Sequence, residues 1–301
     1  MRVKFWGVRG SIASPGKETS EFGGNTSCIE MEDDDGNVFV FDAGTGIRAL
    51  GMDLAKRKVN NIHLFITHTH WDHIQGFPFF TPAYIPGTTI HIYGPSHFEK
   101  TLKKIMDLQM DYAYFPISMQ QLNAKIDYTQ LKEASLEIGK TTISTKYSNH
   151  PVTGLCYKVS CNGKTVVYSG DTEPYYNVLN TGAKPAESDF ANEFGEQESD
   201  ENIEDIVAER NELHRKFCQS DLLIHDAQYT EEEYGKFKGW GHSPMEAVIR
   251  MAESVDVKQM ALNHHDPTRS DQNLHDLQAK LQTAFPKMNL FFTKEGMEIR
   301  L

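Results

Sequence analysis

Apolar and β-branched residues recur along the chain in short runs that are separated by turns rich in glycine, asparagine and aspartate. Such runs, bounded by turn residues, are typical of β-strands. In the first half they lie at 2–7, 26–31, 38–42, 62–67 and 89–93, and in the second half at 141–148, 154–160, 164–169, 221–225, 259–263 and 289–293. The pattern therefore predicts two similar sheets, although no sequence repeat relates the two halves.

Four other segments carry apolar residues at helical spacing, at 47–56, 98–110, 243–254 and 273–284. We expect the third helix to use Ser243 as its N-cap and Pro244 as its first residue. Strands interspersed with helices predict an α/β fold, and here an αββα sandwich in which helices flank two packed mixed β-sheets. A chain of 301 residues with 39% hydrophobic content can bury one large core. We therefore expect a single domain over 1–301.

The segment Thr67-His68-Thr69-His70-Trp71-Asp72-His73 directly follows the apolar strand at 62–66. Imidazole and carboxylate groups are the usual ligands of zinc and related metals. Three further candidates each follow an apolar or β-branched run, namely His150, Asp171 and His264. Because loops that follow strands commonly present functional side chains, we expect these residues to complete a site for two metal ions.

This order of residues, H-x-H-x-D-H followed by a single histidine, a single aspartate and a single histidine, resembles the metallo-β-lactamase superfamily, and the resemblance spans nearly all of the chain. It implies two divalent metal ions, zinc first and manganese or iron as alternatives. The lactamases proper usually have a cysteine where this chain has Asp171, which favours a hydrolase of phosphate or thioester substrates. By the resemblance, one ion would bind His68, His70 and His150, the other Asp72, His73 and His264, and Asp171 would bridge them.

The turn Asp42-Ala43-Gly44-Thr45-Gly46 follows another predicted strand. The resemblance implies that this turn lies near the metals and that Asp42 supports the ligand segment by hydrogen bonds. A nucleotide-binding loop is disfavoured because the turn lacks both the G-x-G-x-x-G spacing and a Walker lysine.

Two later loops bear on the type of reaction. His225-Asp226-Ala227 and Gly241-His242-Ser243 resemble the H-E-A-T and H-S-T loops of the tRNA 3′-processing endonuclease and related small phosphodiesterases, with Asp226 in place of Glu and Pro244 in place of Thr. A carboxylate can orient an imidazole and hold it protonated beside an anionic transition state. We therefore expect His242, Asp226 and Asp72 to be catalytic, with Asp72 both binding a metal and accepting a proton from water. His225 is expected to be a core or supporting residue.

These observations favour a hydrolase that cleaves a small phosphodiester, with cyclic nucleotides among the candidates, by means of a metal-activated water. Two alternatives stay open. A thioester hydrolase of the glyoxalase II type would have little need of His242, and a non-hydrolytic di-iron protein would bind oxygen or carry out redox chemistry on the same ligands. Aromatic residues that could stack on a base or belong to the core are Trp71, Tyr112, Tyr114, Phe115 and Trp240.

Charge is concentrated in one segment. Between 187 and 212 the chain has eleven acidic residues and one arginine, a net charge of −10 by 11 minus 1, against −12 for the whole chain. We expect an acidic insertion whose latter part, 203–217, is an amphipathic helix. Its role as a solvated surface, a lid, a partner surface or a homodimer contact stays open. Long RNA or DNA is disfavoured as a substrate because no basic run is present.

Cysteine usage and hydropathy limit the cellular setting. Cys28, Cys156, Cys161 and Cys218 show no C-x-x-C spacing, so we expect buried thiols and no disulfide framework. No window approaches the ~20 apolar residues that a membrane span requires. The first residues enter a strand and lack the apolar core of a signal peptide. We therefore expect a cytoplasmic protein without a membrane partner.

Overall fold

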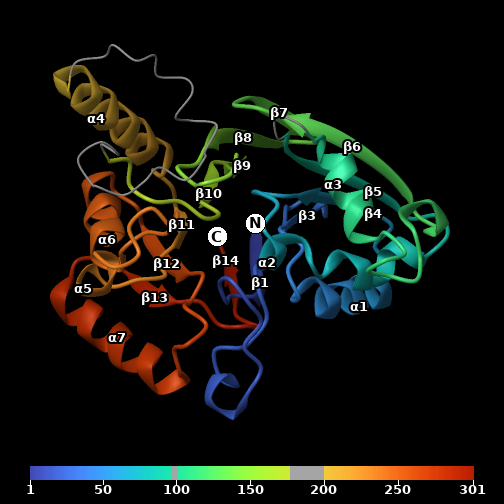
Figure 1. Cartoon of the computed structure of the whole chain (residues 1–301), viewed down its shortest axis with the longest axis horizontal. Coiled ribbons are helices and arrows are strands. Elements are labelled where there is room, and N and C mark those ends of the chain that lie inside the picture. The colour runs from blue at the N-terminus through green and yellow to red at the C-terminus, as the bar shows by residue number, and fades with distance from the viewer. Residues whose placement is uncertain (97–99, 177–199) are drawn as a thin grey trace.

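The computed structural model describes residues 1–96, 100–176 and 200–301, apart from the side chains of 200–202. Within these residues the chain forms two seven-stranded sheets (Figure 1). The first has the order β14 (Glu298–Arg300), β1 (Arg2–Gly7), β2 (Cys28–Glu32), β3 (Val38–Phe41), β4 (Asn61–Phe65), β5 (Thr89–Pro95) and β6 (Lys125–Leu131). The second has the order β13 (Leu290–Phe292), β12 (Gln259–Asn263), β11 (Leu222–Asp226), β10 (Lys164–Tyr168), β9 (Leu155–Cys161), β8 (Thr141–Tyr147) and β7 (Ser135–Ile138).

Both sheets are mixed, and they are mixed in the same way. In the first sheet, strands β14 to β3 pair antiparallel and strands β3 to β6 pair parallel. In the second sheet, β7 to β10 pair antiparallel and β10 to β13 pair parallel. The two predicted sheets are confirmed, and β6, β7 and β14 are strands that the apolar pattern did not predict.

Helices cover the outer face of each sheet (Figure 1). On the first sheet these are α1 (Ile47–Arg57) and α3 (Leu102–Gln109), and on the second they are α4 (Asp200–Phe217), α6 (Met245–Ser254) and α7 (Asp271–Ala284). In α6 the buried residues Met245, Val248, Ile249 and Ala252 follow helical spacing and form one apolar stripe. Short helices occupy the loops: η1 (Lys17–Thr19), α2 (Trp71–Ile74), η2 (Phe77–Phe79), η3 (Thr81–Tyr84), η4 (Met119–Gln121) and α5 (Glu231–Tyr234).

Three apolar layers hold these elements together. The central layer lies between the sheets and includes Phe5, Phe41, Tyr157 and Ile224. One outer layer packs α1 and α3 against the first sheet, and the other packs α6 and α7 against the second. This is the predicted αββα sandwich, and it brings the loops at the ends of β4, β10, β11 and β12 towards one another.

Ser243 does not cap α6: the N-cap is Pro244, and the Ser243 hydroxyl donates to the carbonyl of Thr172 instead, because the loop before the helix packs against the loop after β10.

Of the predicted acidic insertion, 187–199 lie outside the described residues, whereas the residues from 200 onward form α4. In the part of the chain that is described, no helix is long and apolar enough to cross a membrane.

Candidate metal centre

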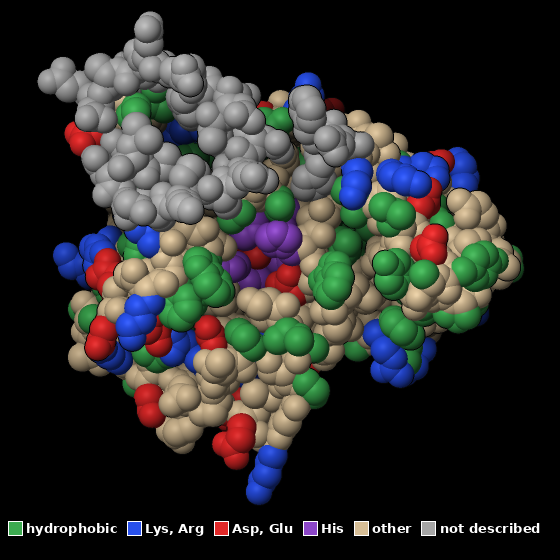
Figure 2. All heavy atoms as spheres, viewed as in Figure 1, with side chains coloured by type: hydrophobic (Ala, Val, Ile, Leu, Met, Phe, Trp, Pro, Cys, Tyr) green, Lys and Arg blue, Asp and Glu red, His purple; other side chains and the backbone are tan. Residues whose placement is uncertain are grey.

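The predicted ligand segment lies in the loop after β4, where it turns into α2. His68, Asp72 and His73 are buried, whereas His70 is exposed. In Figure 2 histidines and acidic side chains gather at the bottom of a hollow that is bordered by hydrophobic and uncharged groups. Among the described residues visible on that face, no lysine or arginine borders the histidines. The open side of the centre is therefore the side of His70.

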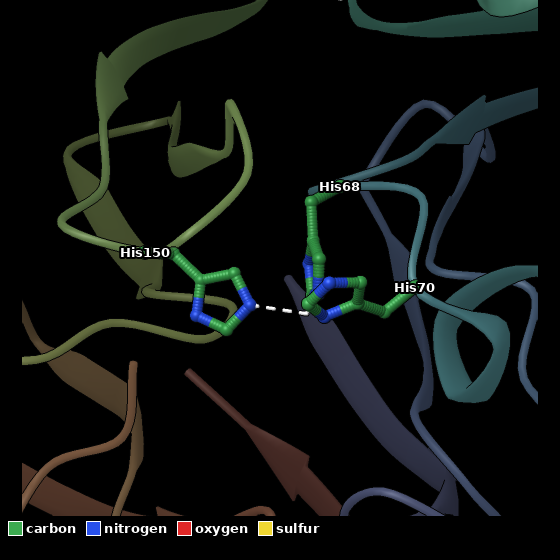
Figure 3. Close-up of side chains that lie close together, drawn as sticks. All are labelled: His68, His70 and His150. Carbon is green, nitrogen blue, oxygen red and sulfur yellow. Dashed lines mark hydrogen bonds between the residues drawn. The ribbon is translucent and has the colours of Figure 1, made fainter. Parts of the chain in front are cut away.

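The first group of candidate ligands consists of His68, His70 and His150, whose rings point toward one another from two loops (Figure 3). Their ligand atoms lie within 4.8 Å of one another. The Nε2 of His150 lies 3.1 Å from Nδ1 of His70, and its Nδ1 donates to the carbonyl of Gly241 at 2.9 Å. That hydrogen bond leaves Nε2 of His150 with a free lone pair. A Cβ atom on Gly241 would lie 2.2 Å from the His150 ring, so this close approach requires glycine.

The second group consists of Asp72, His73, Asp171 and His264, all buried, with ligand atoms within 4.8 Å of one another. Asp171 Oδ2 lies 3.1 Å from Nε2 of His73 and 3.5 Å from Nε2 of His68. It therefore lies between the two groups, where a bridging carboxylate would be. The seven predicted ligands thus meet at one place, divided as the resemblance implied, and their role as ligands stays a prediction.

The unsatisfied atoms of this cluster fit two metal ions. His68 Nε2, His264 Nε2 and Asp171 Oδ1 are buried and have no hydrogen-bond partner within the described structure. A buried polar atom without a partner is costly, unless it binds something else. Imidazole and carboxylate together suit zinc, manganese or iron. The residues present therefore fit the metals that the sequence predicts.

Asp42 supports the ligand segment by hydrogen bonds, as predicted. Its carboxylate accepts hydrogen bonds from the backbone and hydroxyl of Thr67, from Nδ1 of His73 at 2.7 Å and from the Tyr168 hydroxyl at 2.8 Å. The contact with His73 places the proton on Nδ1 and turns Nε2 toward Asp171. A carboxylate behind a ligating histidine fixes its ring and raises its basicity.

His242 and Asp226 form a buried pair at the edge of the cluster. Nδ1 of His242 lies 3.1 Å from Asp226 Oδ2, and its ring stacks on that of His264 with centroids 4.9 Å apart. Burial disfavours the charged imidazole, but the carboxylates of Asp226, Asp171 and Asp72 outweigh burial and raise the pKa of His242 to about 9. A protonated imidazole beside the metal groups can donate a proton to a leaving group. His225 is buried, and its Nε2 lies 3.1 Å from Nε2 of His214, so it does not join the seven candidate ligands.

Two supporting contacts were not predicted from the sequence. The carboxylate of Glu173 accepts hydrogen bonds from the Tyr234 hydroxyl and from the backbones of Gly239 and Gly241, so it holds the loop that leads to His242. The backbone of Ser11 donates to Asp72 Oδ2 at 2.8 Å. Neither residue lies in a recognisable motif; the one signal for Glu173 is its position two residues after Asp171.

Two exposed tryptophans are close in sequence to residues of the candidate centre. Trp71, between His70 and Asp72, is 80% exposed, and Trp240, two residues before His242, is 62% exposed. Phe115 instead packs against the apolar layer of the first sheet, while Tyr112 and Tyr114 are exposed. The two tryptophans are therefore available to a substrate, whereas Phe115 is partly buried against the core.

Comparison with known proteins agrees with this geometry. The family model described as anti-Pycsar protein Apyc1 matches residues 18–190, more than half of the 301-residue chain. Ribonuclease Z of Staphylococcus carnosus is 25% identical, with 98% of both chains covered. Among solved structures, the short form of human tRNase Z has a TM-score of 0.62 at 18% identity and covers 100% of this chain and 99% of its own. Zinc-bound PqqB from Methylobacterium extorquens has a TM-score of 0.64 at 12% identity, with 100% of both chains covered.

The matched range contains six of the seven candidate ligands, all except His264. The metallo-β-lactamase fold protein YhfI from Bacillus subtilis has a TM-score of 0.64 at 17% identity and covers 99% of this chain and 98% of its own, so the chain has the metallo-β-lactamase fold. The chain therefore belongs to the family described as anti-Pycsar protein Apyc1, near the ribonuclease Z-like branch of the metallo-β-lactamase superfamily.

Proposed function

We propose that this protein is a hydrolase that uses two divalent metal ions, zinc first, to cleave a small phosphodiester, and a cyclic nucleotide in particular. The observation that carries the proposal is the buried His242–Asp226 pair, because it adds a proton donor to a cluster that otherwise contains only candidate ligands. A leaving alkoxide needs such a donor. A thiolate leaves readily without one, so a thioester hydrolase would have little use for the pair.

Asp72 and His242 have different roles in the proposed reaction. When bound, the two ions would acidify a water molecule and offset negative charge on the phosphate oxygens. Asp72, held by the backbone of Ser11, is the acceptor of the proton from the attacking water. His242, oriented and kept protonated by Asp226, donates its proton to the departing oxygen.

The surroundings of the centre favour a small substrate. A long nucleic acid is normally bound by lysine and arginine side chains along its phosphates. Among the described residues in Figure 2, such side chains lie away from the histidines, while exposed Trp71 offers a flat apolar surface beside His70. An aromatic face of this kind can stack on a single nucleobase. Membership of the anti-Pycsar family and the ribonuclease Z relatives agree with phosphodiester chemistry, since a ribonuclease cleaves phosphodiester bonds.

The test is a substrate screen with the purified metal-loaded protein. We expect turnover of bis(p-nitrophenyl) phosphate and of 3′,5′-cyclic nucleotides, and little turnover of a glutathione thioester. His242→Ala should lower phosphodiester turnover by ~10²-fold or more while leaving metal content unchanged, which is the usual scale for losing one general acid or transition-state donor.

His91→Ala is the matched control, because His91 lies on β5 and contacts Asn61. It should keep the activity of the unaltered protein. Activity confined to thioesters, or unchanged phosphodiester turnover in His242→Ala, would contradict the proposal. Two irons per chain with a coloured protein and no hydrolysis would favour the redox alternative.

A further inference from the structure

A second cluster of metal-binding side chains lies outside the centre described above. His214 belongs to α4, Cys218 follows directly after the end of that helix, and His225 is in β11. One donor atom from each lies within 4.8 Å of the other two. Cys218 and His225 are buried and His214 is partly exposed. The reaction proposed above uses none of these three residues.

The distances within this cluster are those of ligands around one ion. The Nε2 atoms of His214 and His225 lie 3.1 Å apart, and Nε2 of His214 lies 3.4 Å from Sγ of Cys218. From the usual zinc bond lengths, a tetrahedral site places two nitrogen ligands about 3.3 Å apart and a nitrogen and a sulfur about 3.6 Å apart. Both observed separations are close to these values.

The hydrogen bonds leave donor atoms directed into the cluster. Nδ1 of His225 donates to the carbonyl of Asp226 at 2.7 Å, so Nε2 of His225 holds a free lone pair. This arrangement, in which the second ring nitrogen donates to a carbonyl, is usual for metal-binding histidines. Nδ1 of His214 is buried and has no hydrogen-bond partner among the described residues, and Nε2 of His214, which faces His225 and Cys218, is the ring nitrogen directed into the cluster.

A cavity adjoins the cluster and leaves room for a further ligand. Its volume is about 320 Å³, and His214 and His225 line it together with Thr172, Glu173 and Ser243. Three protein ligands with an open position are typical of zinc sites that bind water or another small ligand as the fourth. Thr172 and Ser243 in the cavity wall are next in sequence to Asp171 and His242. The cluster is therefore close to the candidate active site.

We propose that His214, Cys218 and His225 form a third metal site, which takes Zn²⁺ through two imidazole nitrogens and one thiolate. Cys218 would lose its thiol proton to solvent when the ion binds, since a coordinating thiol is deprotonated. The ion would fasten α4 to β11, whose last residue, Asp226, pairs with His242. The site does not depend on which substrate the protein cleaves.

Cobalt is the probe because, of the three groups of metal-binding side chains found among the described residues, only this one contains a sulfur ligand. The seven candidate ligands of the main centre are histidines and aspartates, so a thiolate-to-cobalt charge-transfer band in the near ultraviolet reports the third site alone. Protein produced in cobalt-supplemented medium should contain three cobalt ions per chain and show this band. In Cys218→Ser the band should disappear and the content should fall to two ions. His214→Gln, at a partly exposed helical position, should also lose one ion.

Cys161→Ser is the matched control, because Cys161 is a buried cysteine of the central apolar layer. It should keep both the band and the third ion. With zinc supplied, Cys218→Ser and His214→Gln should unfold at a lower temperature than the unaltered protein. The decrease in Cys161→Ser should be smaller. A folded, unaltered protein that holds two cobalt ions and shows no thiolate band would overturn the proposal, as would a band that persists in Cys218→Ser. Either result would leave a metal-free cluster of hydrogen-bonded side chains.

Discussion

The two halves of the sandwich contribute to the metal centre in different ways. The first half supplies four of the seven candidate ligands from one seven-residue segment after β4. The second half supplies three from three separate loops, which carry His150, Asp171 and His264. The ligands of the first half are close because they are near in sequence, whereas those of the second half meet only when the sheet has formed.

The hydrogen bonds that hold the candidate ligands in place also differ between the two halves. In the first half, the Asp42 carboxylate supports the ligand segment through Thr67 and His73, and the backbone of Ser11 supports it through Asp72. In the second half, Glu173 joins its own loop to the loop that carries Gly239 and Gly241, and Asp226 joins Thr172 to His242. Loss of Asp42 should therefore weaken ligands locally, whereas loss of Asp171, which contacts His68 and His73, should affect both metal groups.

Asp171→Ala should have the largest effect, because Asp171 Oδ2 contacts both His68 and His73. Both metal groups should lose affinity together, beyond the ~10- to 100-fold typical of losing an outer-shell partner, and activity should vanish. Elemental analysis and a turnover assay check this. Asp127→Ala, at an exposed position on β6, should change neither. Full dinuclear occupancy in Asp171→Ala would contradict the bridging role.

Asp226→Asn should come next, because it keeps the shape of the side chain and removes the charge beside His242. Asp226 raises the pKa of His242, so without that charge the pKa falls and the imidazole stays protonated only at lower pH. Turnover at neutral pH should fall by ~10²-fold, and the alkaline limb of the kcat profile should move to lower pH. Metal content should not change. An unaltered pH profile would exclude a positioning role for Asp226.

Asp42→Asn should have a smaller effect that is confined to the first half. The amide that replaces one carboxylate oxygen faces donors from Thr67, His73 and Tyr168, so at least one hydrogen bond is lost. Metal affinity should weaken by ~10- to 100-fold, measured by competition with a chelator. Asp53→Asn, on the exposed side of α1, is the control. Equal metal affinities in the two variants would argue against a supporting role for Asp42.

Neutralising the exposed acidic residues of α4 should have the smallest effect. Glu204, Asp205 and Glu209 are exposed, and charges separated by more than about 8 Å interact weakly at physiological salt. With Glu204→Gln, Asp205→Asn and Glu209→Gln combined, kcat for a small phosphodiester should stay within about threefold. A large joint change in kcat and KM would instead indicate that this acidic surface acts on the centre.

The sequence predicts those features whose signal is local. Spacing alone identifies the segment from His68 to His73, and helical periodicity identifies α6. The strand β6 escapes prediction because all but one of its side chains are exposed or partly buried and they do not alternate clearly. Ser243 is predicted as a cap, but its hydroxyl bonds to Thr172, a residue far away in sequence. Glu173 is recognised only in three dimensions, because its partners, Tyr234, Gly239 and Gly241, lie on another loop.

The most direct test of a metal centre shared by both halves is a crystal structure of the zinc-loaded protein with anomalous data at the zinc edge. At this centre, apart from any ion held by His214, Cys218 and His225, we expect two anomalous peaks about 3.5–4 Å apart, the separation usual in two-metal sites. One should lie among His68, His70 and His150, the other among Asp72, His73 and His264, with Asp171 between them. A single peak bound only by residues of the first half, or no peak at this place in an active protein, would contradict it.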